Sequence, residues 1–324
     1  MRYRELGRTG LQVSEIGIGA WGIGGVMMID GRPGSYGAAD DAEAIRMIHW
    51  GLDQGINFID SAPAYGFGHS EELVGQALKG RRDKVIVETK VGEHHVNGLP
   101  VWRFDPPFVR EAIDQSLRRL QTDYIDSYVL HLPSAGGVST EQALEAIETA
   151  RDSGKVRFAG ASIYSNDQGV ELTASGRCDV IQQVVSLLQA EATQALLPTA
   201  LEHGVGIVAR QVLFKGFLTD AVTRETVFAD TDMRSRYPKE TVRGYFDRID
   251  ELSFLWSDGR RRRIEAAIQY ALSHPAVGTV ICGAVTQQEL SDAVAAGDAA
   301  PFSDEETARV AEIQQRQLVA AVAR

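Results

Sequence analysis

Short apolar runs alternate with longer amphipathic segments along almost the whole chain. The segments between the runs have apolar residues at helical spacing, as in 106–120, where Val109, Ile113 and Leu117 share one face behind two opening prolines. The helical segments are 41–55, 106–120, 140–154 and 260–274. The apolar runs, which have the length of buried strands, are 15–20, 56–60, 85–90, 125–131, 156–162, 179–185, 206–211 and 278–284. Strands alternating with helices predict a parallel sheet.

The number of strands favours one of the two common parallel architectures. Eight strand–helix repeats over about 300 residues are typical of a (β/α)8 TIM barrel. An open doubly wound sheet usually carries a G-x-G-x-x-G turn that leads directly into a helix. The glycine-rich segment 17–25 is instead followed by the polar stretch 29–40, so we interpret it as a loop at the barrel mouth. A polar segment at residues 2–13 predicts an N-terminal β-hairpin ahead of the barrel.

One connection is much longer than the others. Residues 214–259 separate the seventh predicted strand from its helix and contain Tyr237, Tyr245, Phe246 and Trp256. A long connection at the carboxyl end of a barrel strand is typical of a lid or binding loop. The alternative is a helical addition packed on the barrel rim. No repeat or linker interrupts the chain, so we expect residues 1–324 to form a single domain with an insertion after the seventh strand.

Charge and composition narrow the class of partner. The chain has a formal net charge of −11, which argues against nucleic acid or an anionic membrane as the main partner. Its one basic run, Arg260 to Arg263, is interpreted as a solvated first helical turn. No stretch approaches the ~18 apolar residues of a membrane span, and the start has no signal-peptide core. With only two cysteines, the chain is expected to be cytoplasmic and reduced. No pattern indicates its oligomeric state.

Four polar residues stand at or just beyond the ends of three consecutive predicted strands. Asp60 ends the second strand, Tyr65 follows in the next turn, Lys90 ends the third strand and His131 ends the fourth. Each residue alone has an ordinary explanation, such as a turn cap, a packing ring or an exposed amine. In a parallel barrel, however, these strand ends meet at one face, where barrel enzymes carry their chemistry. We therefore expect the four side chains to form a catalytic set.

An acid, a phenol, an amine and an imidazole suit proton donation to a carbonyl oxygen. A free tyrosine has a pKa near ~10, so it is protonated at neutral pH but is a poor donor. A nearby Lys90 ammonium would favour the phenolate and is expected to lower the pKa of Tyr65. A buried ammonium needs a carboxylate partner, for which Asp60 is the candidate. His131 could hold the substrate oxygen against the phenol.

The residues around these four positions resemble those of the aldo-keto reductases. FIDSAPAYGFGHSEELVGQAL (58–78) resembles the family signature of Asp, Tyr-Gly, Ser-Glu and a helical Gly. ETKVG (88–92), YVLHLP (128–133) and SGKVRFAGAS (153–162) are similar to the segments around the family lysine, histidine and fifth strand. The resemblance extends from about residue 3 to residue 296. It implies transfer of a hydride between a nicotinamide cofactor and a small-molecule carbonyl or alcohol.

The resemblance also implies roles for further residues. Tyr65 would be the proton donor, Lys90 and Asp60 its tuning partners, and His131 the group that orients the substrate. Trp21 and Trp102 would line the substrate pocket. The expected cofactor-binding residues are Ser162, Gln182, Arg210, Gly216, Gly283 and Glu289.

Departures from the family pattern leave the choice of cofactor open. The resemblance implies NADP(H), whose 2′-phosphate the family holds with cations after the eighth strand. Here residues 281–300 contain no Lys or Arg, and Glu289 takes a position where an arginine is common. NAD(H) is therefore a serious alternative. In addition, Ile163 replaces an amide-bearing Asn, and Arg210 stands where many members place an aromatic ring on the nicotinamide.

Two other functions use the same pocket. One is a non-redox lyase or epimerase that holds its cofactor tightly, and the other is a cofactor-sensing regulatory subunit. The adjacent His94 and His95 have no nearby cysteine or carboxylate set in the sequence, so we expect no metal site.

Overall fold

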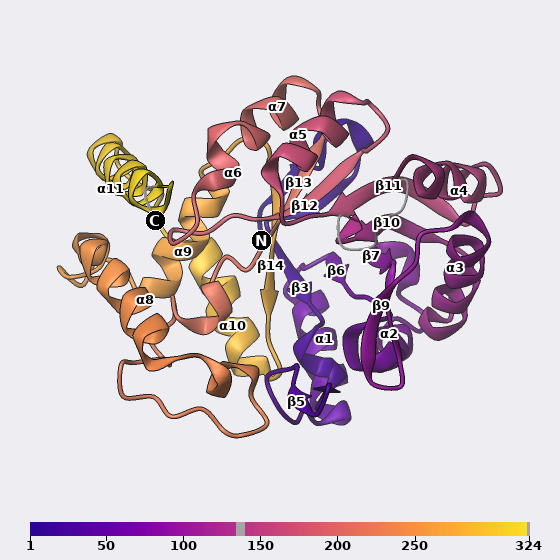
Figure 1. Ribbon diagram of the computed structural model, residues 1–324, viewed down its shortest axis with the longest axis horizontal. Coiled ribbons are helices and arrows are strands. Elements are labelled where there is room, and N and C mark those ends of the chain that lie inside the picture. Colours follow the sequence, from indigo (N-terminus) through magenta and orange to yellow (C-terminus); the bar gives the residue numbers. More distant parts are fainter. Residues whose placement is uncertain (134–139, 323–324) are drawn as a thin grey trace.

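The computed structural model describes residues 1–133 and 140–322 and is built around a closed barrel of parallel strands (Figure 1). The strands follow the order β10-β11-β12-β13-β14-β3-β6-β7 around the barrel. Each lies on one of the predicted apolar runs, which confirms the predicted TIM barrel. The strands are β3 (Ile16–Gly19), β6 (Phe58–Asp60), β7 (Ile86–Val91), β10 (Ile125–His131), β11 (Val156–Ser162), β12 (Val180–Val184), β13 (Gly206–Arg210) and β14 (Val277–Gly283).

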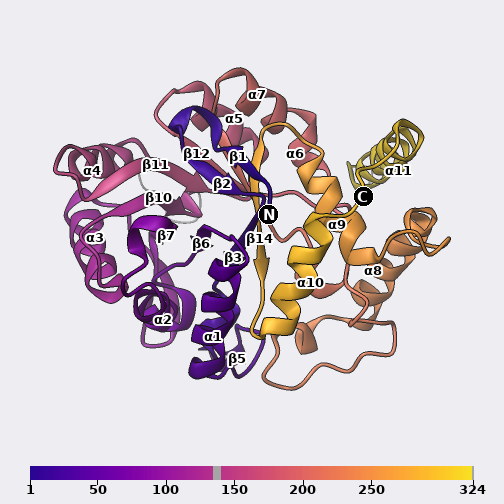
Figure 2. The ribbon, with the colours of Figure 1, turned by 180° about the vertical axis from the view of Figure 1, so that it is seen from behind.

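Helices surround the barrel in both views (Figures 1 and 2). The third one begins as its sequence predicts, since the Asp105 side chain accepts a hydrogen bond from Phe108 N and Pro106 occupies the first turn. The described helices are α1 (Asp41–Asp53), α2 (His69–Ala77), α3 (Pro106–Leu120), α4 (Thr140–Asp152), α5 (Asn166–Ala174), α6 (Glu191–Gln194), α7 (Leu196–Glu202), α8 (Lys239–Glu251), α9 (Arg263–Leu272), α10 (Gln287–Gly297) and α11 (Asp304–Val322). None of them is both long enough and apolar enough to cross a membrane.

The predicted N-terminal hairpin closes the amino end of the barrel (Figure 2). It consists of β1 (Tyr3–Glu5) and β2 (Gln12–Ser14), paired antiparallel. Leu6, at its turn, is completely buried in a cluster with apolar side chains from the barrel interior, including Phe58 and Val208. The contact is close enough that a Cβ on Gly206 would lie 2.7 Å from the Leu6 side chain. This apolar plug leaves only the opposite end of the barrel open.

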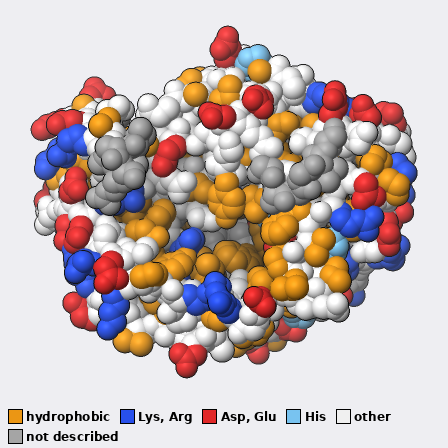
Figure 3. All heavy atoms as spheres, in the orientation of Figure 1, with side chains coloured by type: hydrophobic (Ala, Val, Ile, Leu, Met, Phe, Trp, Pro, Cys, Tyr) orange, Lys and Arg blue, Asp and Glu red, His pale blue; other side chains and the backbone are white. Residues whose placement is uncertain are grey.

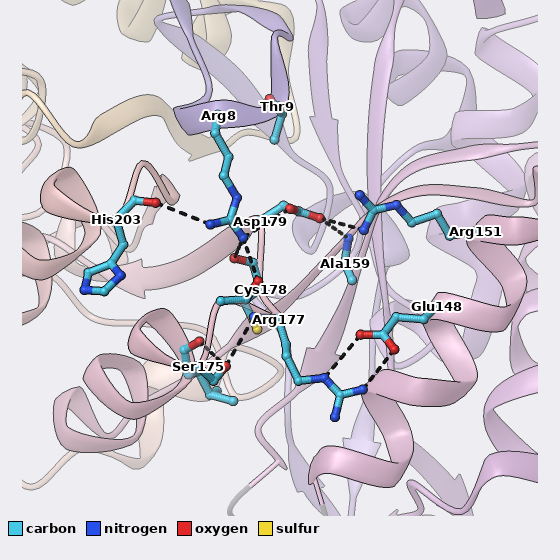
Figure 4. A network of polar contacts seen from close by, with 12 residues as sticks. Arg8, Thr9, Glu148, Arg151, Ala159, Ser175, Arg177, Cys178, Asp179 and His203 are labelled. Atoms are coloured by element: carbon cyan, nitrogen blue, oxygen red, sulfur yellow. Dashed lines mark hydrogen bonds and ion pairs between the residues drawn. The ribbon is translucent and has the colours of Figure 1, made fainter.

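Three buried carboxylates surround the closed end, each near the start of a strand. They are Glu15 before β3, Asp126 in β10 and Asp179 before β12, and each contacts two arginines. Figure 4 shows the Asp179 network, in which the carboxylate also accepts from Ala159 N. The pairs are Arg2 and Arg4 on Glu15 (2.7 and 2.6 Å), Arg82 and Arg157 on Asp126 (2.7 and 2.6 Å), and Arg8 and Arg151 on Asp179 (3.5 and 3.3 Å). Since the pairs lie at the amino ends of the strands, opposite the face where barrel enzymes carry their chemistry, we interpret the pairs as structural.

Two small hairpins stand at the open end of the barrel, and neither was predicted from the sequence. The first pairs β4 (Met28–Ile29) with β5 (Arg32–Pro33), between the glycine-rich segment and α1. The second pairs β8 (Glu93–Val96) with β9 (Leu99–Trp102), directly after β7. Their tips meet where Asp30 N donates a hydrogen bond to Gly98 O at 3.2 Å. Together they form one wall of the barrel mouth.

The segment 214–259 combines both structures considered for it. Its second half contains α8, which packs on the first half through an aromatic cluster of Phe217 with Phe228, Tyr237, Tyr245 and Phe246. Arg248 of this helix donates a hydrogen bond to Leu188 O, in the loop after β12. Its first half crosses to the hairpin β4–β5, where Met233 N donates to Ser35 O at 2.8 Å. The helical addition and the mouth-lining loop are therefore successive parts of one insertion.

Candidate active site

The four strand-end residues converge on one point inside the barrel. Lys90 is completely buried, and its ammonium donates hydrogen bonds to the Asp60 carboxylate and to Ser61 O, the latter at 2.8 Å. The same ammonium lies 4.7 Å from the centre of the Tyr65 ring. The ring of His131 meets the edge of Tyr65 with a centroid separation of 6.1 Å. The predicted set is therefore assembled, and its ion pair is Lys90–Asp60.

Tyr65 is held by a tight turn that rests on the glycine-rich loop. The turn passes through the left-handed region at Gly66 and Phe67, with φ of 61° and 57°. A Cβ on Gly66 would lie 2.3 Å from Gly24 O, so only glycine allows the two loops to approach this closely. Trp21, from the same loop, stacks beside Tyr65 with a centroid separation of 6.2 Å. The loop of residues 20–25, which follows β3, thus positions the phenol.

A second buried carboxylate, Glu88, joins the set and was not predicted. The Gln182 amide donates to both Asp60 and Glu88, at 2.8 and 2.7 Å, and its oxygen accepts from Ser162 at 2.8 Å. Ser127 donates to the other Glu88 oxygen at 2.7 Å. In the sequence, Glu88 places a charged residue inside the predicted strand VIVETK. Because charged residues are rarely buried without a role, this charge could have marked Glu88 as a site residue. Both amide hydrogens of Gln182 are therefore used inside the protein.

Burial controls the proton affinities of the set. It raises the pKa of the Tyr65 phenol, Asp60 raises it further, and Lys90 and Arg210 only partly offset this. Lys90 lowers the pKa of Tyr65 as expected, but burial outweighs its effect, so the pKa of the phenol lies above its ordinary value. Burial, then Lys90 and Arg210, hold the pKa of His131 well below its usual value. Burial also lowers the pKa of Lys90, but the charges of Asp60, Tyr65 and Glu88 raise it above its ordinary value overall.

These residues lie at the floor of a cavity of about 780 Å³. Figure 3 shows the molecule hollowed at the centre of this face, with hydrophobic side chains around the hollow and basic ones beside it. Lys90 lies beneath the floor, and all the other predicted site residues line the cavity: Trp21, Asp60, Tyr65, Trp102, His131, Ser162, Gln182, Arg210, Gly216, Gly283 and Glu289. The volume is within the range of ligand pockets, roughly 300–1,000 Å³.

Arg210 lies beside the set at the end of β13. Its guanidinium donates to Ile163 O at 2.7 Å and stacks 4.4 Å above the Tyr164 ring. Its Nε is buried, with no hydrogen-bond partner among the described residues. Many family members are expected to place an aromatic ring on the nicotinamide at this position. Here the position holds a cation fixed by its neighbours, and its Nε donor is unused among the described residues.

The far end of the cavity is rich in carboxylates. Glu289 lies in the first turn of α10 and accepts a hydrogen bond from Val285 N at 2.8 Å. Arg262, from the basic run, bonds to Asp292 and Glu265 at 2.9 and 2.7 Å. Its charge is therefore already balanced within the protein. Gly216, with φ of 88°, and Gly283 allow the backbone to form the wall itself.

The mouth hairpins contribute residues that the sequence did not single out. Glu93 and Tyr36 line the cavity next to the predicted Trp21 and Trp102. Burial raises the pKa of Tyr36, partly offset by Arg234, and also raises the pKa of Glu93. No sequence signal marked them, because neither hairpin has the length or apolar character of a predicted strand.

Polar groups on the cavity wall fit the carboxamide of a nicotinamide cofactor, which both donates and accepts hydrogen bonds. Ser162 and the Gln182 oxygen can still accept hydrogen bonds, and Arg210 Nε is an unused donor beside them. A metal has no comparable site, since within 1–133 and 140–322 no three His, Cys, Asp or Glu side chains come close enough to hold one. His94 and His95 instead contact Phe108 and Phe67, at 4.9 and 4.8 Å between ring centroids.

Comparisons with known proteins agree with this site. The chain is 34% identical over 290 residues to the aldo-keto reductase YhdN of Bacillus subtilis, covering 88% of this chain and 85% of that protein. It is 29% identical over 310 residues to the NADH-specific methylglyoxal reductase of Escherichia coli, covering 91% and 93% of the two chains. The holo form of an aldo-keto reductase from Bacillus halodurans is 30% identical, with a TM-score of 0.79 and coverage of 97% and 96%.

A glycerol dehydrogenase from Gluconobacter oxydans is also 30% identical, with a TM-score of 0.80 and coverage of 97% and 95%. The model of the aldo/keto reductase family matches residues 15–315, which is nearly the whole chain. The resemblance noted in the sequence is thereby confirmed, and this chain belongs to the aldo-keto reductase family of oxidoreductases.

Proposed function

We propose that this protein interconverts small carbonyl compounds and alcohols with NAD(H) or NADP(H), using Tyr65 as the proton donor. The observation that carries the proposal is the placement of Lys90, buried between Asp60 and the Tyr65 ring at the floor of the cavity. His131 borders the same floor. A phenol next to a fixed ammonium is an arrangement suited to general acid catalysis.

The four residues divide the proton chemistry between them. Since burial keeps the phenol of Tyr65 protonated, it can donate to the carbonyl oxygen during reduction. The Lys90 ammonium then stabilises the phenolate, while Asp60 keeps that ammonium charged and in place. Tyr65 recovers its proton from solvent after the alcohol leaves. His131, whose lowered pKa keeps it neutral, orients the substrate oxygen.

The nicotinamide, when bound, supplies the hydride for reduction and accepts it in the reverse direction. The residues that would hold the cofactor are those predicted for it. Ser162 and Gln182 would bind the carboxamide, and Arg210 would contribute its free Nε donor. Gly216, Gly283 and Glu289 would border the rest of the molecule.

The far end of the cavity supports use of both cofactors. Glu289 and Asp292 place carboxylates there, and Arg262 is already paired with Asp292. Lys215, from the insertion, also lines the cavity and provides positive charge, whereas Arg234 is paired with Asp232 at 2.6 Å. A pocket with both signs of charge discriminates weakly against a 2′-phosphate. We also propose that residues 1–324 form one domain, in which the insertion of residues 214–259 acts as a lid and supplies part of the binding wall.

The proposal is tested with the purified chain and each reduced cofactor. Loss of absorbance at the reduced-nicotinamide band is followed with a panel of small aldehydes and ketones, and its gain is followed with polyols and the oxidised cofactors. We expect turnover with at least one carbonyl–alcohol pair, and Tyr65→Phe provides the inactive control. Conversion of a substrate without net absorbance change would support a lyase or epimerase instead. Cofactor binding without any turnover would support a regulatory subunit.

A further inference from the structure

We propose that Glu93 binds a hydroxyl group attached next to the substrate carbonyl, which makes the enzyme selective for hydroxylated ketones and aldehydes. The inference rests on the proposed function, because it takes the carbonyl to be reduced beside Tyr65 and His131. The hydroxyl itself is not changed in the reaction. It only anchors the substrate.

The hairpin β8–β9 brings Glu93 to the substrate end of the cavity. Glu93 and Trp102 are directly paired across the two antiparallel strands, so their side chains share one face of the hairpin. Both line the cavity. His94 and Val101 form the next pair and therefore belong to the opposite face, where His94 packs against Phe108.

The Glu93 carboxylate lies beside the predicted catalytic imidazole. One of its oxygens is 3.4 Å from His131 Nδ1, and the other is 3.9 Å from His95 Nε2. Because Nδ1 of His131 is buried, a carbonyl oxygen held by Tyr65 and His131 would meet Nε2, and a group on the neighbouring carbon would extend along the cavity wall that Glu93 also lines. A hydroxyl on that carbon is the group that can reach the carboxylate.

Within residues 1–133 and 140–322, the Glu93 carboxylate is covered but weakly paired. Its side chain is only 16% exposed, and its two ion-pair contacts are the His131 and His95 nitrogens at 3.4 and 3.9 Å, neither of which has a hydrogen-bond partner among these residues. Its two neighbours are imidazoles, and burial lowers the pKa of both His131 and His95, which keeps them uncharged. A covered carboxylate without donors is costly, and a substrate hydroxyl would supply the missing hydrogen bond.

The other walls of the cavity strengthen the preference for a hydroxylated substrate. Trp21, Met27, Ile29 and Trp102 line the same cavity with apolar surface, and Trp102 lies next to Glu93 on its face of the hairpin. A substrate with a methyl group in place of the hydroxyl would fit the space but leave the carboxylate without a donor. Pockets that offer a hydrogen bond reject analogues that cannot make it far more strongly than apolar pockets reject a change of size.

The test compares hydroxyacetone with butanone, two ketones that differ by a hydroxyl in place of a methyl group. For the wild-type enzyme we expect kcat/KM to favour hydroxyacetone. Glu93→Leu should lower kcat/KM for hydroxyacetone by about tenfold or more, the scale of a lost hydrogen bond to a charged group, with little change for butanone. Glu93→Gln keeps the shape and an accepting oxygen, so it should keep part of the preference. His94→Gln, on the opposite face of the hairpin, should leave the ratio of the two substrates unchanged.

Two outcomes would overturn the subsite while leaving the proposed function intact. The first is a wild-type enzyme that reduces both ketones without favouring hydroxyacetone. The second is an equal loss for both ketones in Glu93→Gln and Glu93→Leu, which would show that Glu93 acts only by positioning His131. If the wild-type chain reduces no carbonyl compound with either cofactor, the proposed function fails and the subsite fails with it.

Discussion

Lys90 donates a hydrogen bond to Asp60 inside the barrel, where the two residues are 0% and 2% exposed. An ion pair this deeply buried does not gain its stability from the pair alone, because both charges lose their hydration. Its consequence is that neither charge can be removed without leaving the other uncompensated. The pair therefore links the stability of the barrel to its proposed chemistry.

Lys90→Met is expected to lower the free energy of unfolding by about 3–5 kcal/mol, because it leaves Asp60 as a buried charge without a cation. Urea denaturation measures this change. Lys155 is the matched control, since its pair with Asp114 has both side chains 44% exposed, and Lys155→Met should cost less than about 1 kcal/mol. Wild-type stability together with wild-type activity in Lys90→Met would contradict the buried pair.

Tyr65→Phe is expected to lower carbonyl reduction by a factor of about 100 or more, the scale of losing a positioned acid. Cofactor binding, followed by quenching of tryptophan fluorescence, should be nearly unchanged, because the ring and its contact with Trp21 remain. A variant that keeps most of its activity would rule out Tyr65 as the proton donor.

Glu88 should make stability depend on pH between about 5 and 7. Burial, and then the nearby Asp60 charge, raise the pKa of Glu88 from 4.5 to about 7. In this window the folded chain holds a proton that the unfolded chain has lost, so stability falls as pH rises and the loss is complete above pH 7. The shift corresponds to a free energy on the order of 3 kcal/mol.

Removal of this titrating group should therefore flatten the stability profile. In Glu88→Gln the free energy of unfolding, measured in urea at several pH values, should decline less than in the wild type over the same window. Parallel profiles for the two proteins would mean that Glu88 is already ionised at low pH in the folded state.

The carboxylates at the closed end of the barrel should affect stability without affecting catalysis. Asp126 accepts from Arg82, Arg157 and Val87 N, so Asp126→Asn leaves buried donors poorly matched. The expected loss is about 1–3 kcal/mol in the free energy of unfolding. At a temperature where the variant is folded, kcat/KM should equal that of the wild type. A selective loss of activity in the folded variant would contradict this and would show that Asp126, at the closed end, affects catalysis at the open end of the barrel.

The charge pattern at the far end of the cavity predicts weak cofactor discrimination. A lost charge-assisted contact to the 2′-phosphate is worth about 1.5–3 kcal/mol, or one to two decades. We therefore expect kcat/KM to favour NADPH over NADH by less than about a hundredfold, or to favour NADH. Steady-state kinetics with both cofactors at one pH and ionic strength measure the ratio. A preference for NADPH of about a thousandfold or more would contradict the inference.

Much of the barrel could be predicted from the sequence, because its information is local. The alternation of apolar runs with helical spacing is a property of neighbouring residues, and it indicated the strands within a residue or two. The gathering of Asp60, Tyr65, Lys90 and His131 also followed, since the carboxyl ends of parallel strands must meet at one face. The resemblance to a family then connected these residues to a chemistry.

The tertiary structure alone decided which groups touch. Gln182 bonds to Asp60 although 122 positions separate them along the chain, and this contact is what draws Glu88 into the same network. Glu93 reaches His131 only through a short hairpin that has no apolar pattern of its own. Such contacts depend on side-chain direction and on the packing of several elements at once. The spacing of residues along a chain carries neither, so the surroundings of the four residues, and with them the proton affinities and the proposed substrate subsite, arise only in the folded barrel.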